Sequence, residues 1–142
     1  MELVEIIEWL RSIEDLAFQL YRKAAEKFKD RQELFSFLDH LAGDETWHYH
    51  LMGSAVEMLK KQGVSPVSVI AVDARTRANV EGALAKAFAK LEQPSLAAGA
   101  LLESVMEIEF SEMNDVFLYV INSCQPYSKT FQHMASIIQT HE

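Results

Sequence analysis

The sequence predicts an all-α protein built as a four-helix bundle. Long stretches contain neither Gly nor Pro, and apolar residues in them recur every three or four positions, as one face of a helix requires. Several of these apolar stripes also contain a Glu residue, which points to a polar site inside the bundle. With 142 residues, the chain fits a single domain over 1–142, with one core.

The first two helices are predicted to form an antiparallel hairpin. Residues 2–29 lack Gly and Pro and carry one apolar face, so they form the first helix. Asp30, followed by Glu33, resembles a capping box and predicts a tight turn into a second helix over about 31–62.

A long crossover is expected next, over residues 63–94. Gly63 and the nearby Pro66 supply a helix stop. A shorter amphipathic segment over about 75–92 then predicts a short helix within the crossover.

A second hairpin completes the prediction. Ser95 can cap a third helix over 95–123, and Pro126 fits the first turn of a fourth helix over 126–142. Hairpin, long crossover and hairpin together define the ferritin-like variant of the four-helix bundle. The inner face of the third helix is expected to hold Leu102, Val105, Met106, Met113, Val116, Phe117 and Val120.

The net charge of −8 argues against nucleic acid or an anionic membrane surface as the main partner, and leaves a cation as a natural ligand. No apolar run approaches the ~20 residues that span a bilayer, and the acidic N-terminus does not resemble an export signal. The lone Cys124 cannot form an internal disulfide, which suits a reducing compartment. A cytoplasmic location is therefore expected.

Three predicted helices place a carboxylate where packing asks for an apolar residue. Glu14, Glu45 and Glu109 each lie within an apolar stripe, and His48 follows Glu45 by three positions on the same helix face. An ionised carboxylate left unpaired there would cost several kcal/mol. Each one therefore calls for a positive partner.

The spacing of the carboxylates favours a metal site over a hydrogen-bonded network without metal, or over ordinary surface Glu residues. Glu14 and Glu45 are nearly equidistant from the turn at Asp30, and Glu109 and Glu142 from the second turn. Their separations of 31 and 33 residues place each pair at a similar height in the bundle. Hard oxygen ligands with imidazole suit iron or manganese.

These residues resemble the di-iron domain of rubrerythrins over nearly the whole chain. That family carries a Glu-x-x-Glu pattern on its third helix, as Glu109 and Glu112 do here, and a Tyr seven residues after the first Glu, as Tyr21 stands after Glu14. The resemblance implies that Tyr21 hydrogen-bonds into the site and that His48 and Glu112 are catalytic. The ligands that it implies are Glu14, Glu45, His48, Glu109, Glu112 and Glu142.

The chain departs from the family in two respects. Rubrerythrins usually append a rubredoxin-like domain with four cysteines, which the single Cys124 cannot supply, so electrons are expected from a separate donor such as a rubredoxin-like protein. The family's His three residues after Glu142 is also missing, so either a longer chain or a partner chain is expected to fill the gap. A second alignment makes His141 the ligand, although the spacing from Glu109 favours Glu142.

The resemblance implies a centre of two iron ions, with manganese or zinc as alternatives, that reduces hydrogen peroxide to water in oxidative-stress defence. One iron is expected to shift between His48 and Glu112 as its redox state changes. Two other functions stay open: a ferroxidase or iron-handling protein that uses dioxygen, and a non-catalytic bundle that has lost part of its site. Rubrerythrin-like domains commonly pair, so a homodimer is expected.

Overall fold

The structure is a computed structural model that describes residues 2–67 and 72–140, with the backbone alone at 112, 134, 135 and 138–140. The all-α prediction is confirmed for these residues, because their regular elements are helices and their only extended pairing is an isolated bridge between Glu2 and Val67. The elements are α1 (Leu3–Lys27), α2 (Gln32–Lys61), α3 (Ala74–Leu91), α4 (Ala98–Glu109), α5 (Glu112–Cys124), the 3₁₀ helix η1 (Gln125–Tyr127) and α6 (Lys129–Thr140).

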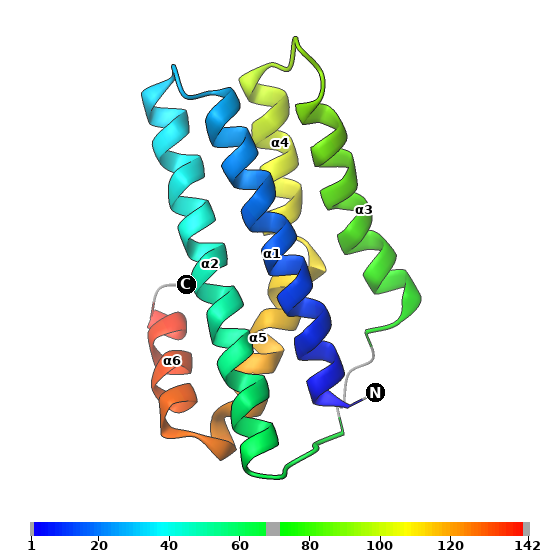
Figure 1. The fold of residues 1–142 in the computed structure, drawn as a ribbon, viewed down its shortest axis with the longest axis vertical. Coiled ribbons are helices and arrows are strands. Elements are labelled where there is room, and N and C mark those ends of the chain that lie inside the picture. Colours follow the sequence, from blue (N-terminus) through cyan, green and yellow to red (C-terminus); the bar gives the residue numbers. More distant parts are fainter. Residues whose placement is uncertain (1, 68–71, 141–142) are drawn as a thin grey trace.

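The helices run back and forth along one long axis (Figure 1). Helices α1 and α2 form a long antiparallel hairpin, which makes the most extensive contact in the molecule. Helix α3 returns along α1 to the opposite end, α4 and α5 run back one after the other, and α6 turns back along α5. Helix α1 contacts α2, α3 and α5 and is therefore the central element of the core.

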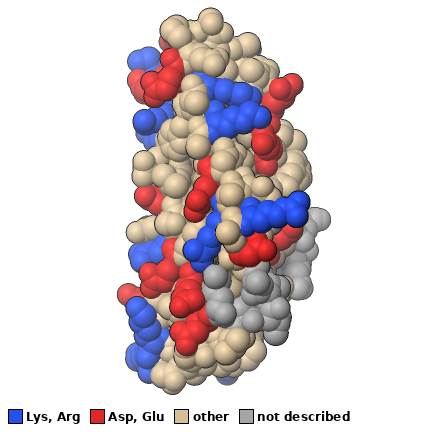
Figure 2. Space-filling model, turned by 90° about the vertical axis from the view of Figure 1, so that its right-hand side faces the viewer, with Lys and Arg blue, Asp and Glu red and all other residues tan. Residues whose placement is uncertain are grey.

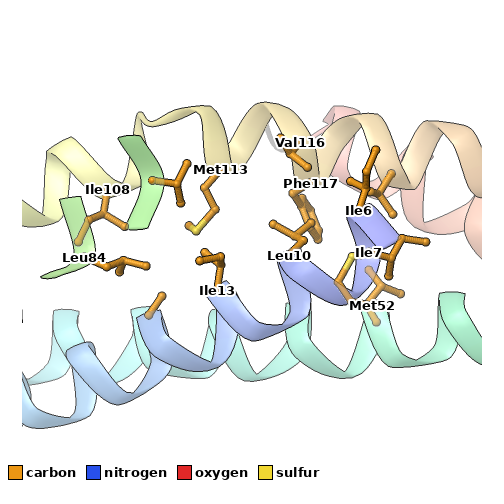
Figure 3. Close-up of a cluster of buried hydrophobic side chains, with 14 of the residues drawn as sticks. Ile6, Ile7, Leu10, Ile13, Met52, Leu84, Ile108, Met113, Val116 and Phe117 are labelled. Carbon is orange, nitrogen blue, oxygen red and sulfur yellow. The ribbon is translucent and has the colours of Figure 1, made fainter. Parts of the chain in front are cut away.

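The core lies where the apolar stripes of α1 to α5 meet, and Phe131 of α6 also belongs to it (Figure 3). Helix α1 supplies the largest share, because its buried positions follow one another at intervals of three and four residues and form a continuous stripe. The labelled side chains in this view are Ile6, Ile7, Leu10 and Ile13 from α1, Met52 from α2, Leu84 from α3, Ile108 from α4, and Met113, Val116 and Phe117 from α5.

Local signals explain several helix ends. Gly63 follows the C-terminus of α2 with φ of 65°, a left-handed conformation that only Gly adopts readily. Asp73 caps α3 by accepting a hydrogen bond of 2.9 Å from the backbone N–H of Thr76. That hydrogen bond holds the pKa of the Asp73 carboxyl below its usual range. The predicted capping box at Asp30 is absent, because Arg31 is the N-cap of α2 and makes no side-chain cap bond.

The turn between α3 and α4 is tied to α1 by a lysine. Lys27 Nζ donates hydrogen bonds to the carbonyl oxygens of Leu91, at 3.1 Å, and Gln93, at 2.9 Å. This ammonium satisfies carbonyl groups that the end of α3 leaves without helical partners. The predicted cap at Ser95 does not form, and α4 begins three residues later at Ala98 with Ala97 as its N-cap.

The predicted continuous helix over 95–123 is interrupted at Phe110 and Ser111, between α4 and α5. The physical reason is a change in the phase of the apolar stripe. Within α4 and within α5, buried residues recur every three or four positions. Among the side chains that the structure describes, the next buried one after Ile108 is Met113, a step of five positions. A single straight helix cannot turn both stripes toward the core.

Ser111 closes both ends of this interruption. Its hydroxyl donates to the carbonyl of Ile108 at 2.7 Å and accepts from the backbone N–H of Met113 at 3.2 Å. The same side chain therefore satisfies an acceptor at the end of α4 and a donor at the start of α5. Phe110 is left 79% exposed.

The predicted inner face of the third helix is wrong in its first half, which corresponds to α4. Leu102 and Met106 are exposed, whereas Leu101, Val105 and Ile108 are buried. The buried stripe of α4 is thus turned toward α3, which packs against it and connects to it through a 3.0 Å hydrogen bond from Lys90 Nζ to Ser104 Oγ.

The last helix begins later than predicted. Pro126 lies in η1, and α6 begins at Lys129 rather than near 126. Gln62 Nε2 donates a 2.8 Å hydrogen bond to the carbonyl of Tyr127, which fixes η1 against the end of α2. The predicted helix end at 141–142 lies outside the described residues.

Acidic and basic side chains alternate along the face that α3 occupies in Figure 1, without a continuous patch of either sign in this view (Figure 2). In the described part of the chain, no helix combines the length and the apolar character that a membrane crossing requires.

Replacing Ser111 with Ala tests the double cap. We expect Ser111→Ala to lower the free energy of unfolding by about 1 kcal/mol, because the backbone N–H of Met113 loses its cap acceptor. The carbonyl of Ile108 also loses the hydroxyl donor, although it keeps its bond from the backbone N–H of Ser111. Ser12→Ala is the matched control, since Ser12 lies within α1 and donates only to the carbonyl of Trp9. Ala there should change stability by no more than about 0.5 kcal/mol. Urea unfolding that gives equal effects for both variants would contradict the role of Ser111.

Candidate metal centre

Three side chains from the α1–α2 hairpin converge inside the bundle. Glu14 comes from α1, and Glu45 and His48 lie one turn apart on α2, facing it. One donor atom from each of the three lies within 4.8 Å of the other two. His48 Nδ1 is 3.5 Å from Glu14 Oε2 and 3.7 Å from Glu45 Oε2.

Both carboxylates are deeply buried, yet each keeps an oxygen without a hydrogen-bond partner. Glu14 is 1% exposed and Glu45 is 2% exposed. Their Oε2 atoms, which face His48, have no hydrogen-bond partner among the described residues. Leaving a buried polar atom unpaired costs about 1–3 kcal/mol, and more where the group is charged. The site therefore carries an unfavourable energy that a cation would relieve.

The donor set fits a divalent metal ion in both spacing and chemistry. Ligand atoms that share one ion, each at about 2 Å from it, lie roughly 3–4 Å apart, as the Oε2 atoms do from His48 Nδ1. Two carboxylates with one imidazole suit iron, manganese or zinc. The orphaned oxygens and the donor types thus agree on a cation site.

A second polar pair lies close to this group. Glu109 is the last residue of α4, and Tyr21 Oη donates a 2.6 Å hydrogen bond to its Oε1. Burial, together with the charge of Glu109 and this hydrogen bond, raises the pKa of Tyr21 above its ordinary value, so the phenol keeps its proton.

Glu109 lies in the electric field of the first group. Burial raises the pKa of the Glu109 carboxyl, and the nearby Glu45 charge adds to this effect. The hydrogen bond from Tyr21 and the proximity of His48 act in the opposite direction. Glu109 thus interacts with both α2 residues, although it does not belong to the group whose donor atoms lie within 4.8 Å of one another.

Aromatic packing orients His48. Its ring lies against Phe117 of α5, with ring centroids 4.2 Å apart and planes tilted by 33°, and Trp47 approaches it at 5.5 Å. The side chain of His48 is 22% exposed, so one side of the site lies toward solvent. The role of Phe117 was not predicted, although its place on the expected inner face, eight residues after Glu109, was available as a signal.

The other predicted site residues are placed only in part. Glu112 is the first residue of α5, and its side chain lies outside the described part of the structure. Glu142 and its alternative His141 also lie outside the described residues. The structure thus brings Glu14, Glu45 and His48 together and links Glu109 to Tyr21.

Two other histidines lie away from the site. His40 is exposed and lies 3.7 Å from Asp44 on the surface, and His50 is exposed.

In comparisons with known proteins, no protein-family model, curated protein or solved structure matches the chain. The chemistry of the site therefore rests on the geometry described above.

The buried carboxylates should destabilise the metal-free protein. At pH 7 and with chelator, we expect Glu14→Met to raise the free energy of unfolding by about 1–3 kcal/mol, because it replaces a buried charge with an apolar chain of similar shape. Added divalent cation should stabilise the wild type and leave this variant almost unchanged.

Asp15→Asn is the matched control, because Asp15 neighbours Glu14 in sequence but is exposed and accepts only from Gln19. Its stability should follow the wild type with and without cation. If Glu14→Met instead destabilises the metal-free protein by 1 kcal/mol or more, Glu14 contributes to packing rather than to a cation site.

Proposed function

We propose that this chain is a rubrerythrin-like protein of ferritin-like fold that binds two iron ions and reduces hydrogen peroxide with electrons from a separate donor. The observation that carries the proposal is the pair of unpartnered oxygens on Glu14 and Glu45, which converge with His48 inside the bundle. Such a donor group has little structural value without a cation.

The arrangement of the helices supports the ferritin-like part of the proposal. The α1–α2 hairpin supplies one half of the bundle, α3 acts as the crossover that returns to the opposite end, and α4 with α5 runs back antiparallel to α1. Helix α6 then gives the final reversal. In this fold, metal ligands come from the inner faces of the bundle helices.

Each residue of the site has a defined task in this function. Glu14, Glu45 and His48 would hold metal, and Phe117 keeps the His48 ring in orientation. Tyr21 holds a proton at Oη, directed at Glu109. Two bound ferrous ions would supply two electrons, which with two protons convert one hydrogen peroxide into two molecules of water. Manganese also fits the donor set, whereas zinc would fit without the redox chemistry.

We also propose that the protein forms a homodimer in the cytoplasm. A groove of about 590 Å³ lies between the N-terminal parts of α2 and α4, and the exposed side chains of Phe37 and Leu102 line it. Exposed apolar surface of this kind favours association. The single thiol, Cys124, is buried and suits a reducing compartment.

Iron binding and oxidation test the function directly. Anaerobic loading should give about two ferrous ions per chain, raise the melting temperature, and yield a ferrous protein that peroxide oxidises faster than dioxygen does. His48→Gln should abolish most of this binding, whereas the exposed His50→Gln should behave as the wild type.

The alternative functions are outcomes of the same experiment. Faster oxidation by dioxygen than by peroxide would indicate a ferroxidase or another iron-handling protein. A melting temperature that does not respond to any divalent cation would indicate a non-catalytic bundle.

Glu112 provides a separate test of the rubrerythrin-like mechanism. If one iron shifts toward Glu112 during turnover, Glu112→Ala should slow peroxide reduction by about tenfold or more while most iron stays bound. Glu103→Ala, at an exposed position of α4, should change neither property. Parallel loss of iron and activity in Glu112→Ala would mean that Glu112 is an ordinary ligand.

A further inference from the structure

We propose that the site is loaded in two steps. Glu14, Glu45 and His48 bind the first divalent cation without Glu109, and Tyr21 holds Glu109 in reserve for the second. This inference rests on the proposed metal-binding function and adds an order of binding to it.

The first step follows from where the three donors lie. They come from two continuous helices that pack along their length as a single hairpin. Their donor atoms already lie within 4.8 Å of one another, so the first cation requires no movement of another element. Glu109 instead comes from the end of α4, next to the interruption, on an element that pairs mainly with α3.

The order follows from which oxygens lack partners. The Oε2 atoms of Glu14 and Glu45 are buried without a hydrogen bond, so a cation between them relieves the largest unfavourable term in the site. Glu109 already receives a 2.6 Å hydrogen bond from Tyr21. A cation that binds Glu109 through Oε1 must compete with the phenol, whereas the first three donors present no such competitor among the described residues.

The charges favour a second ion only after the first has bound. As metal ligands, Glu14 and Glu45 are deprotonated and bring two negative charges, which one divalent ion neutralises. Another ion then needs a further carboxylate, and Glu109 is the one whose charge already interacts with Glu45 and His48. Tyr21 lies two turns after Glu14 on α1, so it connects the reserve ligand to the helix that holds the first ion.

Titration of the metal-free full chain with Co²⁺, followed by calorimetry and by visible absorption, tests this order. The wild type should show two steps, the first of them tighter. Glu45→Gln should weaken the first step by about 100-fold. Glu109→Gln should keep the first step within about threefold and weaken the second by about tenfold or more.

Tyr21→Phe tests whether the phenol competes with the second cation for Glu109 or only supports the fold. It should tighten the second step by about tenfold, because the cation no longer competes with a hydrogen bond to a charged group, and leave the first step within about threefold. Tyr49→Phe is the control, because its ring lies against the Arg11 guanidinium and it lines a pocket that contains none of the four proposed ligands. Both steps should stay unchanged in this variant. Circular dichroism of the metal-free variants checks that all of them fold.

Each contrary outcome has one meaning. Two ions bound in one indivisible step, or a first step weakened as much by Glu109→Gln as by Glu45→Gln, would overturn the order while leaving the metal-binding function standing. A second step unchanged in Glu109→Gln would overturn the role of Glu109 alone. One ion per chain would overturn both the role of Glu109 and the proposed centre of two ions. No binding of Co²⁺ or ferrous ion to the wild type would overturn the proposed function and the order together.

Discussion

Two carboxylates buried in the interface between α1 and α2 are the constraint on which the rest of the structure depends. Glu14 lies between the buried Leu10 and Ala17 on α1, and Glu45 lies between the buried Ala42 and Met52 on α2. Both carboxylates therefore belong to the buried stripes of the two helices. The hairpin must therefore be held by enough apolar contact to tolerate them. Its two helices span 25 and 30 residues and make the most extensive contact in the molecule, which supplies that stability.

The remaining helices complete the enclosure of this hairpin. Helices α3 and α5 cover other faces of α1, so its stripe is buried from several directions. The hydrogen bond between Tyr21 and Glu109 joins residues 88 positions apart and fixes the end of α4 against α1. A buried polar contact of this kind is satisfied in only one register, which makes the packing of the two chain halves more specific than apolar contact alone would.

The features that the sequence predicted well are those that depend on long, regular patterns. The stripes of α1 and α2 extend over many turns, so small errors in a helical wheel do not move Glu14 or Glu45 off the inner face. The relation of Glu45 to His48 depends only on helix geometry. The pairing of Tyr21 with the site was expected from resemblance, but its partner, Glu109, emerges only from the tertiary structure.

The features that the sequence did not predict depend on short stretches of chain and on single hydrogen bonds. Helix α4 has only 12 residues, about three turns, too few for the apolar pattern to fix its inner face, so Leu102 and Met106 were assigned inward. The interruption after Glu109 was missed because no Gly or Pro marks it. It depends instead on a five-residue step in the buried stripe and on a Ser that can serve two helix ends. The starts of α2 and α4 were displaced because the expected caps do not form, and Arg31 and Ala97 precede these helices without a side-chain cap bond.

The interruption between α4 and α5 also changes the electrostatic character of the two positions that it separates. In one unbroken helix, residues 109 and 112 would be equivalent positions one turn apart. Here Glu109 ends one helix, where the macrodipole is negative and repels a carboxylate, and residue 112 begins the next, where the macrodipole is positive and favours one. The backbone alone therefore gives Glu109 and Glu112 different electrostatic surroundings. A cation is attracted more strongly by the helix end at residue 109 than by the helix start at residue 112.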